Sequence, residues 1–82
     1  MASAMDRWVL AVSEELGLTP NLGDTRLILD LTKEVAHNVD RPAAPVAAYL
    51  VGIAVGQGKP PTQAVKCIQD LAAGWEGNSE ES

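Results

Sequence analysis

Apolar residues recur along this chain at the three- and four-residue spacing of an α-helix. The first such segment places its apolar side chains on one face, which holds Met5, Trp8, Val9, Val12 and Leu16. Ser3 and Asp6 at its start resemble a capping box, in which each side chain accepts a hydrogen bond from the other residue's backbone N–H, and Gly17 supplies a stop. These signals predict a first helix over residues 5–16.

A second helix is predicted over residues 25–38, after a loop whose Leu18 and Leu22 we expect to contact the core. Its apolar arc is wide: at 100° per residue it covers about 200°, more than one contact face requires. A narrow polar edge, which includes His37, remains. We therefore expect this helix to lie between two partner helices, with its polar edge in water.

A third helix is predicted over 43–56, and it is apolar nearly all round. No charged residue stands between Pro42 and Gly58, but the helical part spans only about 21 Å, less than a hydrocarbon core of about 30 Å. The pattern favours a buried central helix over a membrane span. Gly52 and Gly56 stand four residues apart, which would let a neighbouring helix approach closely.

A fourth helix is predicted over 62–74, and the chain shows neither strand alternation nor an internal repeat. The predicted fold class is all-α, a compact bundle of about four short helices in one domain over 1–82. We expect order over about 4–76 and disorder in the polar, acidic tail 77–82.

The charge of the chain limits the classes of partner that we expect it to bind. Eleven acidic residues stand against six basic ones, a net charge of −5. Nucleic acid and anionic membranes need clustered Lys and Arg, and here the basic residues are scattered, so we expect neither partner. The chain has a single cysteine, Cys67, and a single histidine, so we expect no internal disulfide, no zinc site and no cofactor, in a reducing cytoplasm. Next to Lys66, Cys67 is best explained as a thiol at the edge of the packing.

His37 and Arg41 are the candidate contact residues for an anion or a partner. Arg41 directly precedes Pro42, so its guanidinium can lie across the N-terminus of the third helix, where free backbone N–H groups favour an anion. Alternatively, Arg41 pairs with Asp40 or Glu34 and locks the turn. For His37 the alternative is a solvated helix end whose dipole a cationic imidazole complements.

No residues have the pattern of a nucleophile with its base or of an acid/base pair, so we expect no catalytic residue and no enzyme activity. Leu10 and Leu29 lie away from the best-defined apolar stripes. A domain this small has a marginal core and gains from a partner. We expect a homodimer or a contact with another protein through Leu10 or Leu29.

A family resemblance is carried mainly by residues 29–56, which read LDLTKEVAHNVDRPAAPVAAYLVGIAVG. It extends to WVLAVSEELGL and to the closing LAAGW, and so covers about residues 6–75. In these motifs the chain resembles a family of small actinobacterial helical domains of unknown function, found alone or appended to proteins similar to the molybdenum cofactor guanylyltransferase. The resemblance implies a cytoplasmic accessory role in the biosynthesis of the molybdenum cofactor, molybdopterin guanine dinucleotide. It brings no catalytic residues.

Three functions remain open at this point. The preferred one is a non-enzymatic helical interaction or accessory module. The second is a small domain that binds an anionic ligand, such as a phosphorylated or pterin-like molecule, near His37 and Arg41. The third is a self-associating structural protein.

Overall fold

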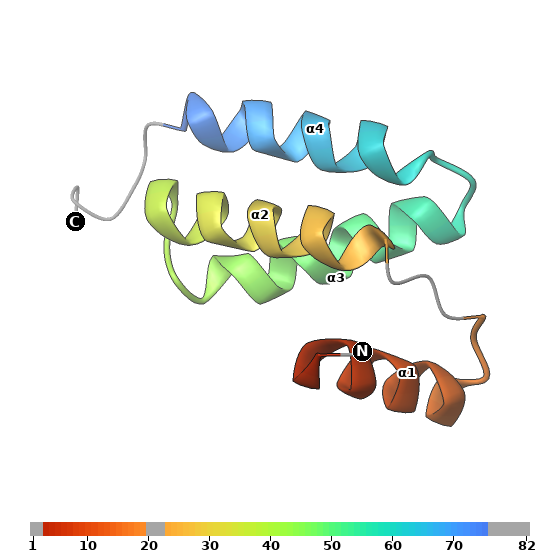
Figure 1. Ribbon diagram of the computed structural model, residues 1–82. Helices are drawn as coiled ribbons and strands as arrows, with labels where there is room; N and C mark the ends of the chain where they lie inside the picture. Colours follow the sequence, from red (N-terminus) through yellow and green to blue (C-terminus); the bar gives the residue numbers. More distant parts are fainter. Residues whose placement is uncertain (1–2, 20–22, 76–82) are drawn as a thin grey trace.

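The computed structural model describes residues 3–19 and 23–75, which form four α-helices (Figure 1). The helices are α1 (Ala4–Leu16), α2 (Gly23–Asn38), α3 (Ala43–Gly56) and α4 (Pro61–Ala73). The described residues contain no strand, so the predicted all-α class is confirmed, and every helix boundary lies within two residues of its predicted place. Among these helices, none has both the length and the apolar character needed to cross a membrane.

α2 is the central helix of the fold. It packs against both α3 and α4, while α3 and α4 contact each other less extensively. The buried side chains of these three helices form one cluster, which consists of Leu31, Val35, Ala44, Val51, Ala64, Val65 and Ala72. The wide apolar arc of α2 allows it to bury two sides at once. The prediction that this helix lies between two partners is therefore confirmed.

α1 stands apart from the other three helices and packs substantially against none of them (Figure 1). Its ends are nevertheless well formed. The Asp6 N–H donates to Ser3 Oγ at 3.0 Å, and the Ser3 N–H donates to Asp6 Oδ2 at 3.5 Å. At the other end Gly17 adopts a positive φ of 72°, the left-handed conformation that closes many helices. The hydrogen bonds of Ser3 and Asp6 confirm the predicted start of this helix, and the conformation of Gly17 confirms its predicted end.

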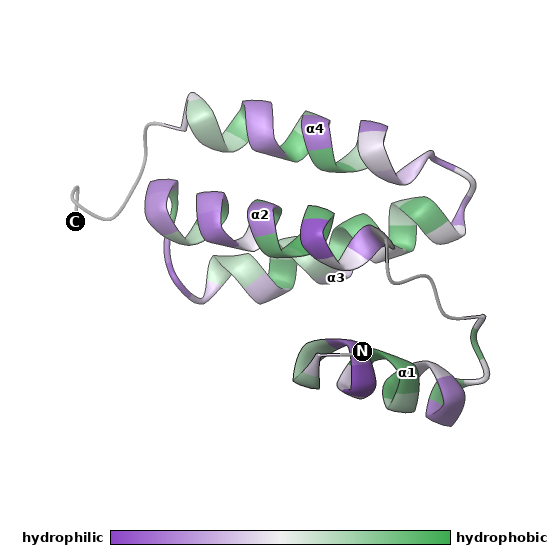
Figure 2. Ribbon diagram, in the orientation of Figure 1, coloured by the Kyte–Doolittle hydropathy of each residue, from purple (hydrophilic) through white to green (hydrophobic). Residues whose placement is uncertain are grey.

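The prediction that residues 43–56 form a buried central helix is wrong. Leu50 is 56% exposed, and nothing lies within 4 Å of the position that a Cβ would take on Gly52 or Gly56. α3 is buried on the side that faces α2 and α4, and the rest of its apolar surface has no partner because α1 is not packed on it. Figure 2 shows the hydrophobic colouring along α3.

The first loop also differs from expectation. Leu18 is exposed and does not hold the loop against the core, because the C-terminal turn of α1 is not packed on the other helices. Leu22 and the predicted tail 77–82 lie outside the described residues.

Candidate functional site

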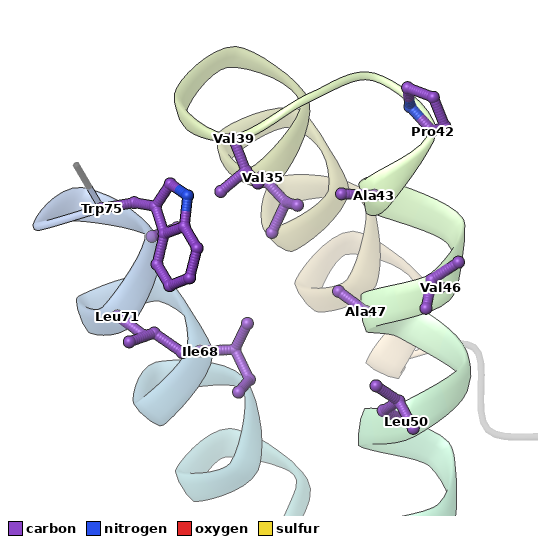
Figure 3. Close-up of a pocket in the computed structure, with 11 residues that line it drawn as sticks. Val35, Val39, Pro42, Ala43, Val46, Ala47, Leu50, Ile68, Leu71 and Trp75 are labelled. Atoms are coloured by element: carbon purple, nitrogen blue, oxygen red, sulfur yellow. The ribbon is translucent and has the colours of Figure 1, made fainter. Parts of the chain in front are cut away.

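An apolar hollow of about 550 Å³ lies between α3 and α4, and the C-terminal half of α2 contributes to its lining (Figure 3). Its lining consists of Val35, Val39, Pro42, Ala43, Val46, Ala47, Leu50, Ile68, Leu71, Ala72 and Trp75. None of these residues carries a charge, and the indole N–H of Trp75 is the one polar side-chain group among them. Side chains of α3 and α4 face each other across the hollow.

A second hollow of about 130 Å³ adjoins the first, toward the turn between α3 and α4. Its lining consists of Leu50, Val51, Ala54, Lys59, Ala64, Cys67 and Ile68. Leu50 and Ile68 line both hollows, so the two form one elongated surface. We call it the α3–α4 groove. It runs from Pro42 and Trp75 at one end to Lys59 at the other, and the exposed thiol of Cys67 lies along it.

The sequence explains why a groove forms here. Small side chains, including those of Ala43, Ala47 and Ala72, line it between the two helices, so they do not fill the space. Larger apolar side chains such as Val46 and Leu71 stand along its rims, where they are more than half exposed. Contiguous exposed apolar surface of this kind is typical of protein-interaction surfaces and of ligand-binding grooves.

α1 presents a second apolar surface, and no other helix packs substantially against it. We call it the α1 face, and it consists of Met5, Trp8, Val9, Val12 and Leu16, the residues that helical spacing places together. Trp8 is 66% exposed and Leu16 is 64% exposed. A hollow of about 310 Å³ lies along this face, lined by Trp8, Ala11, Val12, Glu15 and Leu16. Val9 and Val12 of the same face are half-buried. The described chain therefore carries both an unfilled apolar groove and an amphipathic helix whose largest apolar side chains are exposed.

Comparison with protein families gives one match. The model of a family described as a domain of unknown function, DUF6457, matches residues 1–80. The chain belongs to the DUF6457 family. The match includes all four helices, so the α1 face and the α3–α4 groove both lie within the DUF6457 domain. Neither the curated proteins nor the solved structures gave a match to it.

His37 and Arg41 of this DUF6457 domain are both exposed, and neither lines a hollow described above. The Arg41 backbone N–H donates to Asp40 Oδ1 at 3.0 Å. In the described part of the chain, the Arg41 guanidinium forms no ion pair with Asp40 or Glu34. The anion site and the turn lock both remain predictions, and no observed contact favours either one.

Leu10 and Leu29, the predicted interface residues, are both exposed, on α1 and α2 respectively. They are therefore accessible, and their use in an interface remains a prediction. Within residues 3–19 and 23–75, no three His, Cys, Asp or Glu side chains come together as a metal site would require.

The α3–α4 groove of this DUF6457 domain does not follow from the sequence pattern. Apolar residues at helical spacing, such as Leu50 and Leu71, are assigned to the core by their period alone. The sign that pointed to a groove is the excess of apolar surface on α3, a helix that is apolar nearly all round in a chain of only 82 residues. Two neighbouring helices do not cover that much surface.

Proposed function

We propose that this protein is a non-enzymatic interaction module that binds the apolar face of an amphipathic helix in the α3–α4 groove. The observation that carries the proposal is the lining of the groove, which is apolar along its length and has Lys59 at one end. A helix laid in such a groove contacts it through residues spaced three and four apart. The hydrophobic effect then supplies the affinity, and Lys59 offers a charge contact at one end.

The shape of the groove favours a helix over a small molecule. A volume of about 550 Å³ lies in the range of small-molecule pockets, but those pockets also carry a few placed polar groups that orient the ligand. Here the Trp75 indole is the one such group in the larger hollow. The lining runs along α3 from Pro42 to Ala54, about 18 Å at 1.5 Å per residue. That length suits about three turns of a bound helix.

The lining also supports a binding role rather than catalysis. The larger hollow contains no acid, base or nucleophile, and the smaller one contains only Lys59 and Cys67. General acid–base chemistry requires a titratable group within hydrogen-bond reach of the reacting atom, and nucleophilic catalysis by a thiol requires an activating neighbour. The groove is built for apolar contact.

The proposal is tested by selection from a displayed library of random helical peptides of about 13 residues. We expect the wild-type chain to select amphipathic sequences, and we expect Leu71→Asp, on the rim of the groove, to abolish their binding. Tyr49→Asp is the matched control, because Tyr49 is on α3, is 70% exposed and does not line the groove. Peptides that lack an apolar face, or that bind both variants equally, would contradict the proposal.

The family resemblance supports a first choice of partner, a protein similar to the molybdenum cofactor guanylyltransferase. We propose an accessory role beside such an enzyme in cofactor biosynthesis. The test is co-elution of the two purified proteins in size-exclusion chromatography, with Leu71→Asp and Tyr49→Asp as the variant pair. Loss of co-elution with Leu71→Asp alone would support the role through this groove, and the absence of any complex would refute this choice of partner.

A further inference from the structure

We propose that the occupant of the α3–α4 groove is the α1 helix of a second copy of this chain, so that two copies exchange their α1 helices in a symmetric dimer. This inference rests on the proposed function, because it names the helix that the groove binds. It combines two observations: Met5, Trp8 and Leu16 of the α1 face are exposed, and the groove is unfilled. One chain thus supplies both halves of a helix-in-groove contact.

α1 needs a partner to stay helical. It has 13 residues and well-formed caps at both ends, but no substantial contact with the rest of the described chain. Isolated helices of about 12–15 residues are marginal in water, so caps alone do not hold such a helix. Docking the α1 face would bury Trp8 and Leu16, its most exposed apolar side chains, and so stabilise the helix.

The groove matches α1 in length and charge. Thirteen residues at 1.5 Å each give about 20 Å, close to the length of the groove along α3. Residues 3–19 carry three carboxylates and one cation, while residues 23–75 carry five of each. The helix is therefore acidic and the remainder of the described chain is neutral, so a second copy does not repel it. Glu15 borders the hollow on α1, and Lys59 lies at one end of the groove.

The area of contact favours a reciprocal exchange. A helix about 20 Å long and about 10 Å wide, buried over half its circumference, removes roughly 600 Å² of surface from water when both sides are counted. Stable interfaces bury about 1,200–2,000 Å². One docked helix falls short of that range, and two docked helices reach it. A two-fold exchange also closes on itself, because each copy gives one helix and receives one.

The exchange is tested with three variants of the full chain in sedimentation equilibrium. Trp8→Glu removes the main anchor of the α1 face, and Leu71→Asp places a charge on the groove rim. We expect a wild-type dimer, and a dissociation constant raised roughly 100-fold or more by either change. Leu10→Glu separates the two possible dimers: Leu10 lies outside the α1 face, so the change should leave an exchanged dimer intact, whereas it should disrupt a dimer formed through Leu10 itself. Circular dichroism of each variant should show that the α2–α4 helices remain folded.

Mixing supplies the decisive measurement. In an equimolar mixture of Trp8→Glu and Leu71→Asp chains, the intact groove of the first can take the intact α1 of the second. Because either change disables a whole helix-in-groove contact, each variant alone keeps no intact contact and the mixed pair keeps one. We therefore expect the mixture to associate more tightly than either variant alone and less tightly than the wild-type chain. A dimer that Leu10→Glu disrupts and Trp8→Glu does not, or a mixture that associates no better than its components, would overturn the exchange.

A peptide of residues 3–19 separates failure of the exchange from failure of the groove. If the wild-type chain is monomeric while the peptide binds Trp8→Glu and not Leu71→Asp, the exchange is overturned and the groove remains a helix-binding site. If the chain is monomeric and the peptide does not bind, α1 is not the occupant, and the library selection decides whether any helix is.

Discussion

Leu31 of α2 and Val65 of α4 are the two large side chains that are completely buried in the described part of the chain, and they belong to the same core cluster. The rest of that cluster consists of Val and Ala. A core of this kind is small, so each large side chain in it accounts for a substantial share of the stability.

The first prediction follows from that core. Leu31→Ala should lower the free energy of unfolding by about 2–5 kcal/mol, because the change leaves a cavity where three helices meet. Leu29→Ala, two residues away and 43% exposed, should change it by less than about 1 kcal/mol. Urea unfolding of the two variants gives both values, and equal losses would contradict the placement of the core.

Sequence patterns predicted the helices and their ends because those features are local. The Ser3–Asp6 capping box and the Gly17 stop depend on residues within one turn of each other. The wide arc of α2 also predicted its two partners. The pattern did not specify which helix packs against each apolar face, because periodicity identifies the face and not its partner. For α3, apolar nearly all round, the pattern led to the wrong expectation of a buried helix, whose Leu50 is in fact 56% exposed.

The glycines of the chain give the second prediction. Gly52→Ala should raise the free energy of unfolding by about 0.5–1 kcal/mol, because the added Cβ meets open space and alanine favours the helix. Gly17→Ala should reduce the helicity of α1 and lower its stability by about 1 kcal/mol, because Gly17 holds a φ of 72°. Thermal unfolding and circular dichroism measure the two effects. A destabilised Gly52→Ala would show instead that another helix packs closely there.

Only part of the candidate site could be predicted from the sequence. His37 and Arg41 were selected by charge and position, and the structure places them on the exposed surface, away from the groove lining. The groove itself arises from how α3 and α4 sit over α2, which is a tertiary relationship. Residues such as Val46 and Leu71 look the same in sequence whether they are buried or stand on a rim.

Arg41 gives the third prediction. Arg41→Ala should change the free energy of unfolding by less than about 0.5 kcal/mol, because the guanidinium is exposed and forms no ion pair with Asp40 or Glu34 in the described structure. Thermal unfolding at low ionic strength checks this. A clear loss of stability would support the turn lock, while an NMR shift of His37 on addition of inorganic phosphate, lost in Arg41→Ala, would support the anion site.

The last prediction concerns the direction in which α1 lies in the groove. Glu15 is at the C-terminal end of the α1 face, Lys59 lines one end of the groove, and Arg41 directly precedes Pro42 at the other. Lys59 lines the groove, while Arg41 lies outside the lining, next to Pro42. One direction of the helix brings Glu15 to Lys59, the other brings it toward the end near Arg41, and in the described chain neither cation has an ion pair of its own. Glu15→Lys should therefore weaken dimerisation by about two- to fivefold at low salt, and the effect should shrink as salt rises.

Paired variants determine the direction of α1 in the groove. Combining Glu15→Lys with Lys59→Glu restores the affinity if α1 runs in the direction of α3, and combining Glu15→Lys with Arg41→Glu restores it if α1 runs the other way. Sedimentation of the three single variants and the two pairs distinguishes the directions, because only the pair in contact departs from additivity. If both pairs are additive, Glu15 contacts neither cation and the charge match between α1 and the groove is wrong.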